Sequence, residues 1–148
     1  MPTHFRGTAH QARALNAYIC LMRAAESLTA RLVPLMGGLT PSQFGTLEAL
    51  LHLGPLAQRD LGRKLLKSGG NVTMVVDNLE ARALVRRTRG PRDRRVVTVA
   101  LTPAGRRLIR SLFPRHVRGI VEEMKCLTAR EQDALRALCR RLGRKEKP

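Results

Sequence analysis

Residues 70–82 constrain the fold most, because apolar and polar residues separate cleanly when this segment is drawn as a helix. Val72, Val75, Val76 and Leu79 fall within about a third of the helix circumference. The opposite arc carries small or hydrogen-bonding groups instead of the Glu and Lys of an ordinary solvated face. These residues are Gly70, Asn71, Thr73, Met74, Asp77, Asn78 and Ala81. The pattern predicts a helix with one buried face and one face able to bind a ligand.

A second short helical segment precedes this helix. Residues 58–66 place Leu61, Leu65 and Leu66 on one side, and the sequence Lys67-Ser68-Gly69-Gly70 is typical of a turn. Helix, turn and helix with hydrogen-bonding groups on the second helix is the arrangement by which side chains reach base edges in a DNA major groove. The alternative, from this stretch alone, is an ordinary surface helix with some polar residues.

Two β-prone segments follow, at 84–89 and 95–101, and Gly90-Pro91-Arg92-Asp93 between them is typical of a hairpin loop. We therefore predict a two-stranded wing. Seven arginines and one acid, Asp93, lie between Arg82 and Arg95, which gives this stretch a charge of +6 over 14 residues. Such a cluster repels itself without an anion, and arginine at a narrow hairpin tip fits the DNA minor groove. A solvated basic face is the alternative.

The overall charge also favours a polyanionic partner. The 148 residues carry 28 Lys and Arg against 11 Asp and Glu, for a net charge of +17. Only one Tyr, three Phe and no Trp are present, whereas modules for single strands and RNA usually stack bases on aromatic side chains. The composition favours duplex DNA, and a membrane surface is the competing partner.

Long amphipathic helices are predicted on both sides of this region. Apolar residues recur at spacings of three and four over 9–35 and again after Thr102-Pro103, while Thr40-Pro41 and Thr128 mark further helix starts. Pro114 should kink or split its helix near Leu112. The first helix and the last two carry more apolar surface than a lobe of about 65 residues could cover, so a partner should cover it.

Several motifs, in this order, resemble the MarR family of bacterial and archaeal transcription regulators. The resemblance spans roughly Leu39 to Gly105, with looser agreement in the flanking helices. The position of Ala83 usually holds glycine in the family, so the end of the preceding helix is expected to lack a left-handed glycine. The motifs are Leu39-Thr40 with Gln43, 58–65 (QRDLGRKL), Asn71-Val72-Thr73, 76–80 (VDNLE), 84–87 (LVRR), Asp93-Arg94-Arg95 and 101–105 (LTPAG).

The resemblance implies a mainly α fold with a small β-hairpin wing, in one MarR-like domain over 1–148. Residues 40–101 would form the winged helix-turn-helix lobe, and helices in 9–36 and 103–143 would form the dimerisation region of a homodimer. Such dimers place their recognition helices in successive major grooves about 34–36 Å apart, so the operator should be a pseudopalindrome. Repression by covering a promoter is the expected mode of action.

The family's DNA-contacting positions transfer to three groups of residues in this sequence. We favour Arg95 as the arginine in the minor groove, positioned by Asp93, because residues two apart on a strand share a face. Asp77 could accept from a cytosine amino group or could be a local cap or ion-pair partner. The base-contacting group is Ser68, Asn71, Thr73, Met74, Asp77 and Asn78; the wing group is Arg92, Asp93, Arg94 and Arg95; the phosphate group is Arg63, Lys64, Lys67, Arg86 and Arg89.

Further expectations concern small molecules and oxidants. The resemblance implies a cleft for a small, often phenolic effector, here lined by Tyr18, Met22 and His52. The resemblance also makes Cys20 a candidate redox thiol by its position, with an inert packed thiol as the favoured alternative. Cys126 is the second redox candidate, because it follows the positive charge of Lys125 just ahead of a helix start.

The remaining residues suggest no other chemistry. The four histidines lack the spacing of metal ligands, so no metal or cofactor is expected, and no nucleophile stands beside a base, so no enzyme is expected. No apolar stretch is long enough for a membrane helix, and a cytoplasmic location is expected. The alternative function is that of a nucleoid or RNA-associated architectural protein without sequence preference.

Overall fold

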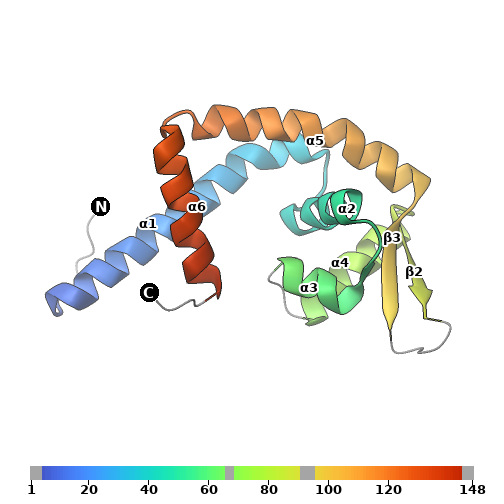
Figure 1. The fold of residues 1–148 in the computed structure, drawn as a ribbon, viewed down its shortest axis with the longest axis horizontal. Coiled ribbons are helices and arrows are strands. Elements are labelled where there is room, and N and C mark those ends of the chain that lie inside the picture. The colour runs from blue at the N-terminus through green and yellow to red at the C-terminus, as the bar shows by residue number, and fades with distance from the viewer. Residues whose placement is uncertain (1–4, 66–68, 91–95, 145–148) are drawn as a thin grey trace.

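A computed structural model describes residues 5–65, 69–90 and 96–144 of the chain. Figure 1 shows α5 as a long arch, with a compact lobe beneath its N-terminal half and α1 and α6 near its C-terminal half. We call the part from α2 to β3 the winged lobe, and α1, α6 and the half of α5 after Pro114 the arm. The elements are α1 (Ala9–Leu32), the 3-10 helix η1 (Val33–Met36), α2 (Pro41–Leu53), β1 (Leu56–Ala57), α3 (Gln58–Leu65), α4 (Gly69–Ala81), β2 (Val85–Arg89), β3 (Val97–Leu101), α5 (Pro103–Met124) and α6 (Ala129–Arg144).

Threonine caps define several helix starts, as the sequence predicted. The Thr40 hydroxyl accepts from the Gln43 backbone N–H at 3.2 Å, while the Gln43 side chain accepts from the Thr40 N–H at 3.0 Å. Thr128 and Glu131 make the same reciprocal pair at α6, and these bonds hold the pKa of Glu131 below its usual value. Each cap satisfies backbone donors that a helix start leaves open.

The sheet has one strand more than predicted. β2 and β3 form the predicted antiparallel hairpin, with Val85 opposite Leu101 and Arg89 opposite Val97. The two residues of β1 add a third strand on the other side of β3, with Leu56 opposite Val99. The prediction of a two-stranded wing was therefore incomplete, because a two-residue strand is too short to show a period-two pattern.

The core lies within the winged lobe, between α2, α4, the sheet and the first half of α5. Leu47, Val76, Leu79, Val99 and Ile109 are inaccessible to solvent. In contrast, neither α1 nor α6 buries a described residue. No helix in the described part of the chain is long and apolar enough to cross a membrane.

Pro114 does not split α5, which runs unbroken from Pro103 to Met124 and bows gently in Figure 1. Of the predicted kink or split near Leu112, the split is therefore wrong. Pro114 is exposed, so the Arg110 carbonyl that loses its usual helical donor can face water. Ile109 and His116 are buried on either side of it and hold both parts of the helix against the lobe.

The end of α4 uses a left-handed alanine. Ala83 has φ +55°, the only positive φ of a non-glycine residue in the described chain. Its N–H donates to the Glu80 carbonyl at 2.8 Å, and the Leu84 N–H donates to the Leu79 carbonyl at 2.9 Å. These are the two bonds of a Schellman motif. The helix thus ends without a left-handed glycine, as the sequence indicated, and alanine takes the conformation instead.

Gly105 lets α5 start directly against this turn. A Cβ at Gly105 would overlap the Leu84 carbonyl oxygen, which accepts from the Thr102 N–H at 3.1 Å. The Thr102 hydroxyl donates to the Ala83 carbonyl at 2.7 Å. These hydrogen bonds therefore join the end of α4 to the end of β3 and the start of α5.

Candidate DNA-binding site

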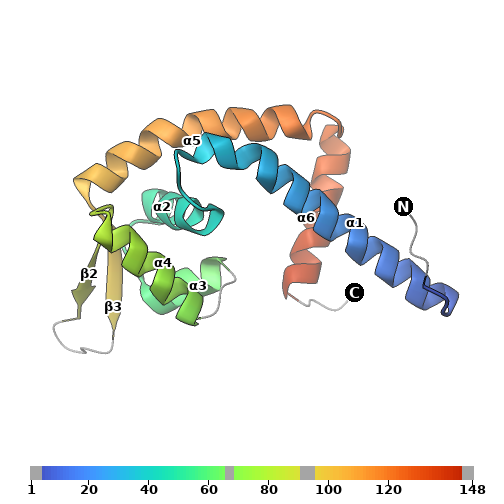
Figure 2. The same cartoon turned by 180° about the vertical axis from the view of Figure 1, so that it is seen from behind.

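The helix α4 presents one face to the core and the other to solvent, as predicted. Its four buried residues are the valines 72, 75 and 76 and Leu79, so the helix is anchored along most of its length. On the opposite side Met74 is 58% exposed. Figure 2 shows α4 across the lobe with α2 between it and α5, so the outward face of α4 points away from the arch.

Most of the predicted DNA contacts fall on described residues, and these are fully or partly exposed. Thr73, Met74, Asp77 and Asn78 are exposed on α4, and Asn71 is partly exposed. Arg63 and Lys64 are exposed on α3, and Arg86 and Arg89 on β2. Their contacts with DNA stay predictions. Lys67, Ser68, Arg92, Asp93, Arg94 and Arg95 lie outside the described residues.

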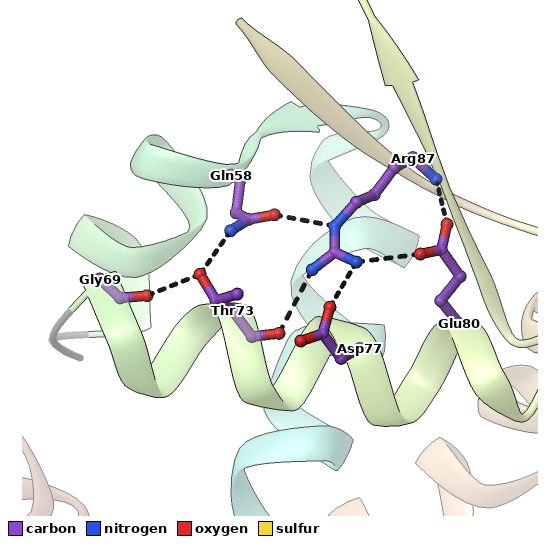
Figure 3. A network of polar contacts seen from close by, with 6 residues as sticks. All are labelled: Gln58, Gly69, Thr73, Asp77, Glu80 and Arg87. Carbon is purple, nitrogen blue, oxygen red and sulfur yellow. Dashed lines mark hydrogen bonds and ion pairs between the residues drawn. The ribbon is translucent and has the colours of Figure 1, made fainter. Parts of the chain in front are cut away.

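A network centred on Arg87 connects the wing to α4 and α3 (Figure 3). The Arg87 side chain is only 22% exposed. Its Nη1 lies 2.6 Å from Asp77 Oδ1 and donates to Glu80 Oε2 at 2.9 Å. Nη2 donates to the Thr73 carbonyl at 3.2 Å, and Nε donates to Gln58 Oε1 at 3.0 Å. Four groups from two helices thus fix one guanidinium.

The same network occupies the hydroxyl of Thr73. This hydroxyl donates to the Gly69 carbonyl at 3.1 Å and accepts from Gln58 Nε2 at 2.9 Å. Glu80 Oε1 also accepts from the Arg87 backbone N–H at 2.9 Å. The polar face of α4 toward the wing is therefore held by protein groups, which leaves the outward face for a ligand.

Arg87 differs from its neighbour Arg86, which is a predicted phosphate contact, because the Arg87 side chain pairs within the protein. Strand alternation explains the difference, since Arg87 shares a strand face with buried Val85 while Arg86 faces the other way. That two-residue period was a signal in the sequence that could have separated Arg87 from its neighbours. Asp77, left open above, is an ion-pair partner. Gln58 and Glu80 were not identified from the sequence.

An open groove of about 510 Å³ lies beside this network. Its walls include Ala57 and Gln58 at the β1–α3 junction, Gly69 and Thr73 at the start of α4, and Val97 of β3. Arg59 adds a positive charge to the rim. The groove therefore borders α4 on the side of the wing.

The candidate effector residues lie in two places. Tyr18 and Met22 are exposed on α1. His52 of α2 lies with its ring 5.0 Å from the Phe113 ring of α5 and its Nε2 3.8 Å from Glu48 Oε1. Whether these residues bind an effector stays a prediction.

His116, which the sequence did not single out, lies at the same α2–α5 interface. It is 8% exposed, and its ring centroid is 4.4 Å from that of Phe44. Within the described residues its Nδ1 has no hydrogen-bond partner. Burial lowers the pKa of His116, and nearby Glu48 opposes this shift. The α2–α5 interface thus contains a buried histidine that is easier to keep neutral than a histidine in water.

All three cysteines are exposed within the single chain. Cys20 is therefore not packed by contacts within one subunit, as the alternative of an inert packed thiol would require. Cys126 donates weakly to the Glu123 carbonyl at 3.6 Å. In the part of the chain that the structure describes, no three His, Cys, Asp or Glu side chains are grouped closely enough to hold a metal ion.

Comparisons with known proteins agree with this geometry. The model of the MarR family matches residues 37–96. The HTH-type transcriptional regulator MhqR of Bacillus subtilis is 33% identical over 133 residues, which are 88% of this chain and 92% of MhqR.

Two solved structures extend the likeness to the whole fold. BpsR of Bordetella bronchiseptica, whose DNA binding is regulated by 6-hydroxynicotinic acid, has a TM-score of 0.78 at 29% identity over 86% of this chain and 98% of its own. PcaV of Streptomyces coelicolor, solved with its natural ligand, has a TM-score of 0.79 at 26% identity over 97% of this chain and 100% of its own. A winged lobe with this helix and strand order, and relatives of this similarity along nearly the whole chain, lead to one conclusion: the protein belongs to the MarR family of DNA-binding transcription regulators.

Proposed function

We propose that the protein is a sequence-specific homodimeric repressor that binds a pseudopalindromic operator. The recognition helix α4 enters a major groove, and the arginines of the wing follow the adjacent minor groove. The observation that carries this proposal is the form of α4, anchored by four buried apolar residues and exposing Met74, Asp77 and Asn78 beside a basic strand.

The arm supports the homodimer. Its helices expose large apolar side chains that a single chain does not cover, and an apolar surface of this kind marks an interface. A symmetric pair would bury the same residues of both copies. The exposed side chains are Tyr18, Met22, Val117, Ile120, Val121, Leu135, Leu138 and Leu142.

A small aromatic acid is the proposed effector. The α2–α5 interface offers the rings of His52 and Phe113, and Tyr18 and Met22 of α1 are the further residues proposed to contact the effector. BpsR responds to 6-hydroxynicotinic acid, which is a ligand of this class. The test is calorimetry of the DNA-bound protein with a panel of phenolic and hydroxynicotinic acids. Failure of every acid to release the DNA would remove the effector from the proposal.

The main experiment is selection of bound fragments from the genome that encodes the protein, followed by titration of the recovered site. We expect a two-fold symmetric motif preferred at least about a thousandfold over unrelated duplex. If the dimer contacts six to ten phosphates, log affinity should fall with log salt at a slope of about −5 to −9. Equal binding to all duplexes would instead indicate an architectural protein. Placing the recovered site over a promoter in a transcription assay then tests repression.

A further inference from the structure

Asp77 is both ion-paired and open to solvent. Its Oδ1 lies 2.6 Å from Arg87 Nη1, yet the side chain remains 58% exposed. Figure 3 shows the second carboxylate oxygen without a dashed contact. An acceptor in this position on a recognition helix faces whatever occupies the major groove.

Arg87 reduces the repulsion between the Asp77 carboxylate and nearby DNA phosphates. An isolated aspartate would be repelled by the phosphates, and its flexible side chain would lose rotamer entropy on binding. Here the guanidinium lies 2.6 Å from Oδ1 and is itself held by Gln58 and the Thr73 carbonyl. The carboxylate is therefore oriented in advance, and its charge is compensated in part, since Arg87 also pairs with Glu80 at 2.9 Å.

We infer that the Arg87–Asp77 pair is a specificity element in which Asp77 accepts a hydrogen bond from the exocyclic amino group of a cytosine in each half-site, while Arg87 acts as its positioning residue. A carboxylate has only acceptors at neutral pH, and cytosine N4 is the amino donor that such side chains read in the major groove. Asp77 would thus be a base contact and an ion-pair partner at the same time. This inference rests on the proposed sequence-specific function.

The test is selection of binding sites from a randomised duplex pool with the full-length protein and its variants. The unmodified protein should select one symmetric cytosine position that Asp77→Ala no longer selects, with discrimination at that base pair falling about tenfold. Asp77→Asn should shift the preference at the same position from cytosine to adenine, because an amide matches adenine N6 and N7.

Arg87→Gln tests the positioning role. It should relax the same cytosine position although Asp77 is still present, whereas a merely structural role would weaken binding to every sequence alike. Circular dichroism and binding to unrelated duplex establish that the variant is folded. Asp60→Asn is the matched control, since Asp60 pairs with Arg63 at 3.3 Å on α3 and its loss should leave base preference unchanged.

The outcomes separate this inference from the proposed function. If the unmodified protein selects no motif, the proposed function fails. If it selects a motif that Asp77→Ala and Asp77→Asn both select unchanged, the inference is overturned and the proposed function stands.

Discussion

The winged lobe and the arm solve the problem of apolar surface in opposite ways. The lobe buries its apolar residues within the chain, and Leu47, Leu79 and Val99 have no solvent exposure. The arm leaves Leu138 60% exposed and buries no described side chain of α1 or α6. The lobe can be stable by its own contacts, whereas the apolar side chains of the arm would be covered in the proposed dimer.

The two regions are joined by few contacts within the described residues of one chain. Within the arm, Arg31 Nε on α1 donates to Glu123 Oε2 on α5 at 2.6 Å, but such an exposed pair contributes little to stability. One connection between the two regions is α5, which is buried in the lobe at Ile109 and carries exposed Val117 and Val121 in the arm; the other is η1, where Met36 is buried between α1 and α2 in the chain. A change of packing around α5 would therefore move one region relative to the other.

The largest expected effect is that of a cavity in the lobe. Leu79→Ala removes a fully buried side chain that joins α4 to the core, and it should lower the free energy of unfolding by about 2–5 kcal/mol. Urea unfolding followed by circular dichroism measures the change. Loss of less than about 1 kcal/mol would contradict a lobe core built on α4.

The second prediction concerns the arm. Leu138→Glu places a charge on the uncovered face of α6 and should weaken self-association by at least about tenfold, because a carboxylate cannot be buried there unpaired. Sedimentation equilibrium measures this self-association and so tests the proposed dimer. Leu53→Glu is the matched control, since Leu53 is also exposed but lies on α2 of the lobe, and it should leave association unchanged.

The third prediction concerns the stability of the lobe alone. Ala83→Gly removes the cost of a left-handed alanine and should raise the free energy of unfolding by about 1 kcal/mol. Gly105→Ala should have the opposite sign, because its Cβ would overlap the Leu84 carbonyl. Thermal unfolding of the two variants compares them directly, and equal signs would contradict the described turn.

The smallest effect is a pH dependence at the junction of the two regions. The pKa of His116 is lowered from 6.5 in the folded protein, so the unfolded chain binds the proton more readily. Stability is therefore full above about pH 6.5 and is lost as the pH falls below that value. Glu48 of α2 faces His116 and reduces this loss.

The measurement is the urea midpoint between about pH 7.5 and 5.5. His116→Phe, which keeps a ring against Phe44, should show a smaller fall than the unmodified protein. His10→Gln, on the exposed start of α1, is the control and should keep the original fall. An unchanged fall in His116→Phe would contradict the assignment.

Most of the fold could be predicted from the sequence because its elements carry local signals. The signals are the pair of Thr40 with Gln43, the period of Val72 to Leu79 and the β-prone run of 96–99, and each acts over a few residues. The strand β1 could not be predicted, since two residues pair only because β3 is already in place. The continuity of α5 through Pro114 likewise depends on the lobe that holds it.

The exposed residues of the candidate site could be predicted from the sequence, but the contacts between its side chains could not. The exposed residues of α4 follow from helical spacing alone. The pairing of Arg87 with Asp77 and Glu80 depends on how far β2 folds back along α4, which no local pattern fixes. The same limit applies to His116, whose burial depends on the packing of α2 against α5.

The most direct test of the account is the stoichiometry of the complex with the selected operator, measured by sedimentation equilibrium with labelled duplex. The account predicts two chains per duplex, with half-sites about 34–36 Å apart, and loss of this complex in Leu138→Glu. A single chain bound with full affinity, or an unchanged complex in Leu138→Glu, would contradict it.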